Sequence, residues 1–355
     1  MISSMRSSPG FLVPLQTQLE SLNLDTLERV NRPGGLEIRD LLDLILRPRD
    51  YSVDLPDNTD PDIDYGTIDL ETRSLGAEAL RDGSTAYCVL AGGSGTRIGM
   101  SKAFLNIPGT ATSLLGLKLL QAKQVKDVWV MSSPSNKKEI EDHLLSIGRP
   151  DVRVFTQFES FRLTLDNNLH MVNGEPDLHP CGHGDVIPAL KHAGVLSDFL
   201  RSGGKRVVVV NVDNLFAAPD PVVVGQHIAG GKPITCEVTE KLKSDTGGIL
   251  CRHIGVDQIV EHFRFSIPLE SDKFKWFSTN TYIFKADLDF STVKWSWHRT
   301  KKEVNHHLVV QHERLMQDLT ATFQTQFIEV PREERFMPIK TSADLENASR
   351  IFRKI

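Results

Sequence analysis

The sequence contains no long hydrophobic run, no excess of basic residues and no closely spaced pair of cysteines. No apolar stretch approaches the roughly 20 residues that a membrane-spanning helix needs, so we expect no membrane partner. The formal net charge is −5, which argues against electrostatically driven binding of nucleic acid. The N-terminal stretch MISSMRSSPGFLVPLQ has one arginine and no sustained apolar core. A signal peptide is therefore not expected, and we predict a cytoplasmic location.

Cysteine is scarce, with four residues in the chain: Cys88, Cys181, Cys236 and Cys251. None of them forms a CxxC motif, which argues against a zinc site or a redox pair. Three of them fall in or beside expected strands. We therefore predict reduced, partly buried thiols rather than disulfides.

Two well-known phosphate-binding motifs are also absent. The chain has no GxxxxGK followed by Ser or Thr, which excludes a P-loop. No glycine run has the GxGxxG register with an acidic residue about 20 positions further on, which disfavours a dinucleotide-binding fold. A nucleotide site would have to be built on another pattern.

Such a pattern is present in residues 86–109, AYCVLAGGSGTRIGMSKAFLNIPG. The apolar run 87–91 predicts a buried strand. Residues suited to phosphate binding follow it: Gly92, Gly93, Gly95, Thr96, Arg97 and Lys102. The glycines allow a tight turn with close approach of backbone N–H groups to phosphate oxygens, and the two cations add charge. A plain glycine turn is the alternative, but the Thr-Arg pair and the lysine favour a nucleoside triphosphate site.

The 355 residues are enough for a large core, and the chain divides by composition into two parts. Residues 1–50 carry leucines at helical spacing, and residues 50–65 are rich in Asp and Pro, as in an extended connector. We predict an N-terminal helical appendage over residues 1–70 and one domain over residues 71–355.

From residue 84 onward, strand patterns alternate with helical patterns. Strands are expected at 85–91, 127–132, 152–156, 205–211, 234–239, 247–251, 280–284 and 326–330. Helices are expected at 113–124, 136–146, 185–201 and 300–321. This alternation predicts an α/β domain with a mixed, mostly parallel central sheet, whose ligand lies at the carboxyl ends of the strands.

Two loops in the middle of the chain carry polar groups. Gln157 follows a strand, and its amide could both donate to and accept from the edge of a base. CGHGDV places Gly182 and His183 before a helix that begins near Asp185. A histidine between glycines is seldom a core residue, so we interpret His183 as a group that positions a phosphate or carbonyl oxygen.

The strand KRVVVVNVDNLF ends in Asn211 and Asp213. A carboxylate at the end of a buried strand, across the sheet from a phosphate loop, is an expected ligand of Mg²⁺, which prefers oxygen ligands and substrate phosphates. A turn-capping aspartate is the alternative. The glycine loop favours the metal, so we predict Mg²⁺ as the cofactor.

Three further residues are candidates for substrate contacts. Glu261 and Asn280 could recognise sugar hydroxyls. Lys340 follows a proline in the apolar stretch RFMPIK, which could fix its ammonium group in place. Each of them taken alone is as easily a surface residue.

In combination and in order, these pieces resemble the eukaryotic-type UTP–glucose-1-phosphate uridylyltransferases and related UDP-sugar pyrophosphorylases. The resemblance covers roughly residues 70–350 and rests on LAGGSGTRIG, FTQ, CGHGDV, NVDNLF, STNTYIF and EVPREERFMPIKTSADL. The chain departs from the family at Ser101, where a proline usually precedes the loop lysine.

The resemblance implies a role for each matching position. Residues on the nucleotide would be Ala91, Gly92, Gly93, Gly95, Thr96, Gln157 and Gly182. Residues on the sugar phosphate would be His183, Asn211, Glu261 and Asn280. Catalytic charge would come from Arg97, Lys102 and Lys340, and Asp213 would hold Mg²⁺.

The resemblance also implies a three-layer α/β/α, Rossmann-like (GT-A-like) fold. It implies as substrates a nucleoside triphosphate, with UTP favoured, and a sugar 1-phosphate, glucose 1-phosphate first. The family's C-terminal β-helix is not expected, because the chain stops soon after Lys340, and the oligomeric state stays open.

Three alternatives remain at this point. The first is a pyrophosphorylase for another sugar 1-phosphate, such as N-acetylglucosamine 1-phosphate, or one that uses GTP. The second is a catalytically silent nucleotide-binding regulator, against which the joint presence of Lys102, Asp213 and Lys340 argues. The third is a scaffold whose N-terminal helices bind a partner.

Overall fold

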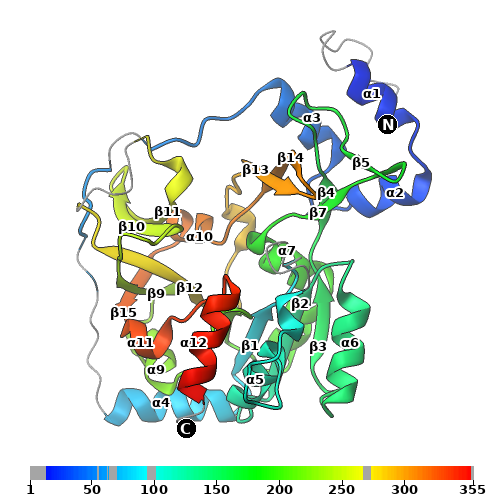
Figure 1. Ribbon diagram of the computed structural model, residues 1–355. Helices are drawn as coiled ribbons and strands as arrows, with labels where there is room; N and C mark the ends of the chain where they lie inside the picture. Colours follow the sequence, from blue (N-terminus) through cyan, green and yellow to red (C-terminus); the bar gives the residue numbers. More distant parts are fainter. Residues whose placement is uncertain are drawn as a thin grey trace.

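The computed structural model describes residues 13–53, 56–61, 63, 70–93, 101–266 and 273–352. Its centre is a nine-stranded mixed sheet with strand order β11-β10-β12-β8-β1-β2-β3, in which β9 also pairs with β12 and β15 pairs with β9 (Figure 1). The strands are β1 (Thr85–Leu90), β2 (Asp127–Ser132), β3 (Arg153–Thr156), β8 (Arg206–Asn211), β9 (Ile234–Glu240), β10 (Gly248–His253), β11 (Val256–Glu261), β12 (Trp276–Lys285) and β15 (Thr325–Glu329). The α/β class is confirmed.

The half of the sheet that follows the glycine loop is parallel. β1 pairs in parallel with β2 and with β8, and β2 pairs in parallel with β3. β8 contributes four consecutive valines, Val207 to Val210, which are all buried because both faces of this half are covered. β12 runs antiparallel to β8 and begins the other half.

Alternate residues of β1 belong to two apolar clusters, one on each face of the sheet. Helices cover both faces, so the molecule has three layers. Ala86 and Cys88 belong to a cluster shared with α7 (Val186–His192) and α8 (Val195–Arg201). Tyr87 and Val89 belong to the other, shared with α5 (Leu114–Gln121), α6 (Lys137–Ser146), α9 (Pro221–Gly230) and α12 (Ser342–Phe352). Period-two alternation of a strand sends neighbouring side chains to opposite faces. The expected α/β/α layering is therefore observed.

Local signals explain where α9 begins and ends. Asp220 accepts hydrogen bonds from the backbone N–H groups of Val222 and Val223, and Pro221 stands at the first helical position. Gly231, with φ of 65°, ends the helix in the left-handed conformation. α4 (Leu70–Arg81) packs against α9 so closely that a Cβ on Gly76 would lie 1.8 Å from the carbonyl oxygen of Pro221.

The expectation of a helix over 300–321 is wrong. The chain there forms a hairpin of β13 (His298–Val304) and β14 (His307–Glu313), followed by the short α10 (Asp318–Thr322). Asn305 and His306 make the two-residue turn with φ of 49° and 64°, which matches the twist of a hairpin. The expected helix 185–201 is interrupted as well, at Gly194 between α7 and α8.

Smaller hairpins and helices complete the described chain. Two further ladders pair β4 (Glu159–Phe161) with β7 (Leu178–Pro180) and β5 (Met171–Val172) with β6 (Glu175–Pro176). Near the C-terminus, α11 (Arg332–Arg335) precedes α12. All four cysteines are free and buried, as predicted. Among the described residues no helix is both long and apolar enough to cross a membrane.

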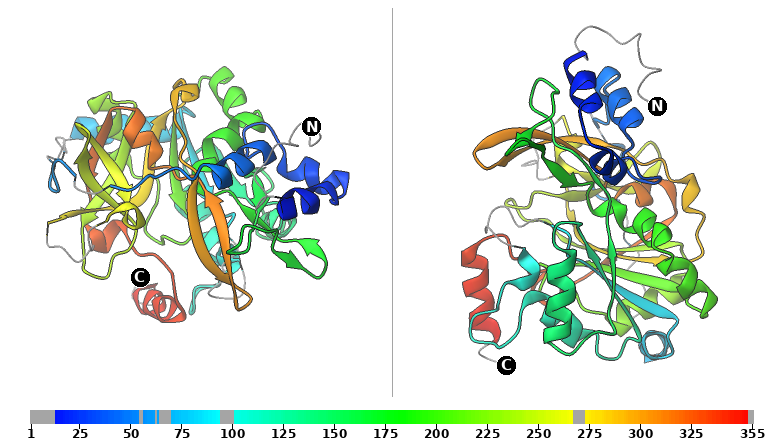
Figure 2. Two further views of the ribbon diagram at one scale, coloured as in Figure 1. Left: turned by 90° about the horizontal axis from the view of Figure 1, so that it is seen from above. Right: turned by 90° about the vertical axis from the view of Figure 1, so that its right-hand side faces the viewer.

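The N-terminal helices are α1 (Val13–Glu20), α2 (Leu24–Val30) and α3 (Ile38–Leu46). They lie at the opposite end of the molecule from α12 (Figures 1 and 2). Their apolar residues join the same cluster as Ala86 and Cys88, namely Leu15, Leu19, Val30, Leu36, Ile38, Leu41, Leu42, Leu44 and Ile45. Arg314 also donates to the carbonyl oxygen of Gly34. The boundary near residue 70 stays a proposal, but the segment is packed into the core rather than detached from it.

Candidate active site

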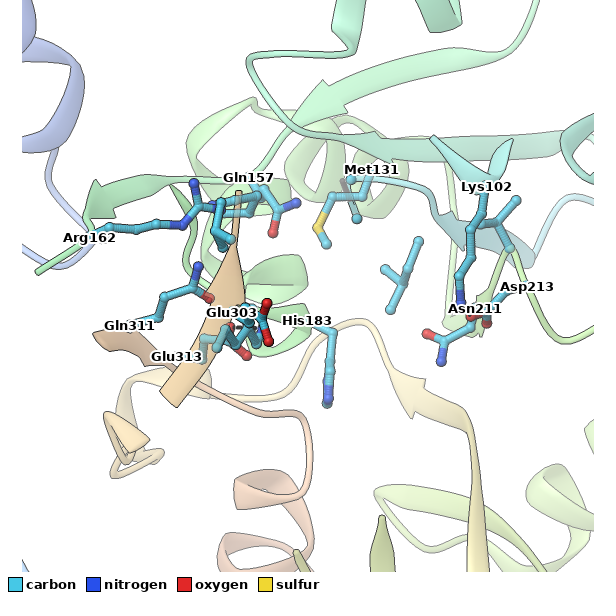
Figure 3. Close-up of a pocket in the computed structure, with 18 of the residues that line it drawn as sticks. Lys102, Met131, Gln157, Arg162, His183, Asn211, Asp213, Glu303, Gln311 and Glu313 are labelled. Carbon is cyan, nitrogen blue, oxygen red and sulfur yellow. Dashed lines mark hydrogen bonds and ion pairs between the residues drawn. The ribbon is translucent and has the colours of Figure 1, made fainter. Parts of the chain in front are cut away.

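A polar cavity of about 970 Å³ opens at the carboxyl ends of the parallel strands (Figure 3). Its lining includes eight of the predicted site residues: Gly92, Gly93, Lys102, Gln157, Gly182, His183, Asn211 and Asp213. In α/β sheets this edge is the usual place for a ligand, since strand ends and loops meet there. The convergence of these residues, which are far apart in the sequence, is therefore a property of the fold.

The glycine loop begins directly after β1. A Cβ on Gly92 would lie 1.9 Å from Nε2 of Gln157 and 3.0 Å from the backbone carbonyl carbon of Ser132, so any larger residue here would displace that amide. Ala91 is fixed next to it, because its N–H donates to the carbonyl oxygen of Met131 at 2.9 Å and its own carbonyl accepts from Asn136 at 2.9 Å. Gly95, Thr96 and Arg97 lie outside the described residues, and their roles stay predictions.

Lys102 and Asp213 meet on one side of the cavity. Nζ of Lys102 lies 2.5 Å from Oδ2 of Asp213, and each side chain is 22% exposed. Lys102 stands at the start of the short 3₁₀ turn Lys102–Phe104, and Asp213 follows β8. The carboxylate and the ammonium group form one polar unit at the place where the loop predicts phosphates.

The C-terminal motif runs along the Asp213 loop. The N–H of Ile339 donates to the carbonyl oxygen of Asp213 at 2.8 Å, and Leu215 donates to Met337 at 3.0 Å. These bonds bring Lys340 beside the Asp213 segment. The side chain of Lys340 is not among the described residues that line the cavity, so its contact with a substrate stays a prediction.

His183 faces the cavity in a defined tautomer. Its Nδ1 accepts a hydrogen bond from the backbone N–H of Met316 at 3.2 Å, which leaves Nε2 as the donor of the neutral ring. Burial lowers the pKa of His183. Gly182 has φ of 96°, and a Cβ there would lie 2.5 Å from the carbonyl oxygen of Arg314. His183 is therefore held as a neutral hydrogen-bond donor.

The loop that carries His183 is anchored by Asp185. Its carboxylate is fully buried, forms an ion pair with Arg314 and accepts from the backbone N–H of Phe158 at 2.8 Å. The guanidinium of Arg314 also lies against the rings of Trp295 and Trp297. This arrangement ties the loop that carries His183 to the segment that follows Gln157.

Asn211 and Asn280 also meet. Nδ2 of Asn280 donates to Oδ1 of Asn211 at 3.1 Å. Asn280 has φ of 59° at an irregularity in the β9–β12 ladder, and within the described chain its Oδ1 is buried without a partner. Glu261 accepts from Nε2 of Gln317 at 2.5 Å. Glu261 and Asn280 are not among the described residues that line the cavity, and their sugar contacts stay predictions.

Sequence reasoning missed one whole side of the cavity. The missed lining residues with polar or sulfur-containing side chains are Met131, Arg162, Lys301, Lys302, Glu303, Asn305, His306, Gln311 and Glu313. Most of them stand on the hairpin of β13 and β14, which had been expected to be a helix. The adjacent Asn305 and His306, a pair that suits a tight turn, were the local signal for it.

The cavity fits a magnesium ion held by a single carboxylate. Among the described residues, no three His, Cys, Asp or Glu side chains gather closely enough to hold a metal. Mg²⁺ is usually bound by one or two carboxylates together with substrate phosphates and water, so a complete protein cage is not required. Asp213 could supply that carboxylate, and the phosphates of a nucleotide would supply further oxygens.

Comparison with known proteins agrees with this arrangement. A UTP–glucose-1-phosphate uridylyltransferase from Hordeum vulgare is 28% identical over 315 residues, which is 80% of this chain and 65% of that protein. One from Solanum tuberosum is 30% identical over 213 residues, 55% of this chain and 44% of that protein. The chain thus spans less than two thirds of the length of these relatives.

Solved structures share the fold. UDP-glucose pyrophosphorylase from Leishmania major has a TM-score of 0.75 at 21% identity, with 96% of this chain and 79% of that chain covered. The uridine diphosphate N-acetylglucosamine pyrophosphorylase from Trypanosoma brucei has a TM-score of 0.67 at 20% identity, with the same coverage. The family model for UTP–glucose-1-phosphate uridylyltransferase matches residues 52–352, a span that holds both the glycine loop and Lys340. The chain therefore belongs to the UTP–glucose-1-phosphate uridylyltransferase family.

Proposed function

We propose that this protein transfers a uridylyl group from UTP to glucose 1-phosphate, giving UDP-glucose and pyrophosphate. The observation that carries the proposal is the cavity, which brings a glycine loop, a base-binding amide, a neutral histidine donor and the Lys102–Asp213 pair together. Membership of the family and the Leishmania major structure that contains UDP-glucose support the same choice.

The two sides of the cavity would hold different parts of the nucleotide. Gln157 lies on one side and Lys102 and Asp213 on the other, with His183 between them (Figure 3). We assign the base to the first side and the phosphates to the second, next to the glycine loop. The Nε2–H of His183 would donate to an oxygen of the sugar phosphate.

The reaction needs little covalent chemistry from the protein. An oxygen of the sugar 1-phosphate attacks the α-phosphorus of UTP, and the bond from that phosphorus to the bridging oxygen of the β-phosphate breaks. No general base is required, because the attacking phosphate is already ionised. The residues act by positioning and by charge: Lys102 would neutralise the triphosphate, and Lys340 the attacking phosphate.

Asp213 would hold Mg²⁺. When bound, the ion neutralises phosphate charge and orients the triphosphate. The ion pair with Lys102 keeps the carboxylate at the phosphate side of the cavity before any metal arrives.

A second sugar 1-phosphate has to be tested beside glucose 1-phosphate. The Trypanosoma brucei protein that shares the fold is named for N-acetylglucosamine, so N-acetylglucosamine 1-phosphate is the second candidate. GTP is the second candidate for the nucleotide. A non-catalytic nucleotide-binding regulator or scaffold would bind UTP without releasing pyrophosphate.

The experiment is a panel of UTP, GTP, CTP and ATP against glucose 1-phosphate and N-acetylglucosamine 1-phosphate, with pyrophosphate release as the readout. We expect release with UTP and glucose 1-phosphate to exceed every other combination. Release only with N-acetylglucosamine 1-phosphate would replace the sugar in the proposal. Binding of UTP without release from any pair would reject catalysis and favour the regulator.

A further inference from the structure

The base side of the cavity holds two polar residues beside Gln157 to which the proposed reaction gives no role. Gln157, Arg162 and Gln311 line it, and their exposed fractions are 5%, 8% and 2%. Neither the side-chain amide of Gln157 nor that of Gln311 hydrogen-bonds another described residue. Nε of Arg162 is buried and also lacks a partner in the described chain. Polar groups of largely buried residues normally have partners, so the gathering of these three on one side of the cavity indicates a polar ligand.

Arg162 is fixed in position by its neighbours. Its Nη1 donates to Oδ1 of Asp177 at 2.6 Å, and Oδ2 of Asp177 lies 3.0 Å from Nδ1 of His170. The backbone adds two bonds, since Arg162 N–H donates to the carbonyl of Asp177 and His170 N–H donates to that of Arg162, each at 2.9 Å. Asp177 therefore orients the guanidinium through Nη1. Nη2, which donates to no other described residue, is the part left for a ligand.

Figure 3 places Arg162 with Gln157 and Gln311 on the side of the cavity away from Lys102 and Asp213. The three residues come from three segments: the end of β3, the residue after β4, and β14. All three line one cavity, so with the triphosphate on the Lys102 side they are placed to meet the base or the ribose of the nucleotide.

The donor properties of the three side chains differ in a way that sets selectivity. An amide can turn to present either its oxygen or its NH₂ group, so Gln157 and Gln311 adapt to either kind of base edge. A guanidinium can only donate. Arg162 therefore favours an acceptor opposite it and opposes another donor.

Uracil and cytosine differ in whether the group at position 4 accepts or donates a hydrogen bond. Uracil carries a carbonyl oxygen at position 4, where cytosine carries an amino group that donates. On the basis of the proposed function, we propose that Arg162 forms the part of the pocket that selects a 4-keto pyrimidine over a 4-amino pyrimidine. Gln157 and Gln311, which can turn their amides, would not provide this selection.

The test compares UTP with CTP in variants of Arg162. The double variant Arg162→Gln/Asp177→Asn removes the cation without leaving Asp177 as an unpaired charge. Arg162→Lys keeps a donor and a positive charge. The readouts are kcat/KM for each nucleotide at saturating sugar phosphate and equilibrium binding of UMP and CMP. Arg153→Gln is the matched control, because Arg153 also pairs with an aspartate, Asp198 at 3.0 Å, but does so on the surface away from the cavity.

We expect the double variant to lower the UTP/CTP ratio of kcat/KM by about ten- to a hundredfold, mainly by weaker use of UTP. Arg162→Lys should keep part of the ratio, and Arg153→Gln should leave it unchanged. Gln311→Leu, which leaves the Arg162–Asp177 pair in place, removes an amide that adapts to either base, so it should weaken use of both nucleotides and leave the ratio unchanged. In a folded double variant, equal losses for both nucleotides, or an unchanged ratio, would overturn the inference.

Failure of the proposed function gives a different result. If the unmodified protein releases no pyrophosphate with UTP, the reaction is wrong, but the preference for UMP over CMP still tests the pocket. Loss of that preference in the double variant, with the preference kept in Gln311→Leu, supports the inference without turnover. A wild-type protein that binds UMP and CMP equally rejects it.

Discussion

Asp213 is the carboxylate on which the phosphate side of the cavity depends. We expect Asp213→Asn to lower turnover by roughly a hundred- to a thousandfold, as loss of one preorganised electrostatic contact does elsewhere. The Lys102–Asp213 pair is partly exposed, so its loss should cost the fold about 1 kcal/mol at most. Turnover at fixed Mg²⁺ and the thermal midpoint measure both effects. Near-normal turnover in a folded variant would remove Asp213 from the mechanism.

Lys102 and Lys340 are expected to serve different phosphates. Lys102→Ala should weaken binding and use of UTP, whereas Lys340→Ala should mainly weaken use of the sugar 1-phosphate. A charge-assisted hydrogen bond is worth about 1.5–3 kcal/mol, so each effect should be roughly ten- to a hundredfold. Titration of each variant with UTP alone, followed by rates against sugar phosphate, separates them.

The exposed Lys123 gives the control for these lysines, and Lys123→Ala should change neither UTP binding nor the rates. If Lys340→Ala keeps full activity with every sugar phosphate tried, the C-terminal motif is structural.

His183 predicts a pH dependence with a definite sign. Its pKa is lowered by burial from the ordinary 6.5, so the ring stays neutral at a pH where a free histidine is half protonated. Nδ1 then keeps accepting from Met316, and this arrangement is lost as the pH falls through the lowered pKa. Activity should therefore hold down to pH 6.5 and decline only below it.

A sugar phosphate also titrates near pH 6, so the profile of His183→Gln is the reference for this prediction. The ratio of the two kcat/KM profiles should be flat above pH 6.5 and fall below it. A ratio that is flat throughout would mean that protonation of His183 does not matter.

At the scale of elements, the loop after β8 is fixed by a buried cation. Lys118 on α5 is completely buried, and it donates to the carbonyl oxygens of Leu215 and Ala217 at 3.2 and 2.9 Å. Burial lowers its pKa. On β1, the hydroxyl of Tyr87 donates to the carbonyl oxygen of Ala217 at 2.8 Å. These bonds hold residues two and four positions after Asp213, so a helix that does not line the cavity helps to position a carboxylate inside it.

Lys118→Met tests this role because it keeps the volume and removes the donors. Gln121 and Tyr87 still donate to the carbonyls of Leu215 and Ala217, so the variant loses two hydrogen bonds without leaving either carbonyl unpaired. That loss should cost about 1–3 kcal/mol in the free energy of unfolding, and a loosened Asp213 loop should lower kcat. Denaturant unfolding and turnover measure the two effects. A variant with reduced stability but unchanged kcat would show that Lys118 supports the fold and not the site.

At the scale of the whole molecule, the N-terminal helices share the core of the α/β domain. Each fully buried leucine or isoleucine contributes about 1.5–3 kcal/mol, and Leu15, Leu19, Leu36 and Leu41 are all at most 1% exposed. We expect deletion of residues 1–47 to lower the thermal midpoint and expose apolar surface that binds a hydrophobic dye. The sequence alone predicts a foldable remainder. An unchanged midpoint would show that the helices are indeed a separable appendage.

The parallel half of the sheet and most of the loops that follow it could be predicted from the sequence. β1, β2, β3 and β8 lie within one residue of their expected bounds, because a buried strand is specified by its own apolar run and by turn residues next to it. The glycine loop, Gln157 and Asp213 were found for the same reason, since each follows such a strand. His183 was found instead from the glycines on either side of it.

Only the tertiary structure decided which groups meet. Asn305 and His306 turned an expected helix into a hairpin that closes one side of the cavity, and this depended on pairing between β13 and β14. The joining of Arg162 with Gln311, and of Ile339 with Asp213, depends on how distant segments cross. Such contacts leave no local pattern, because each partner is specified by a different part of the chain and the cavity exists only once both are packed.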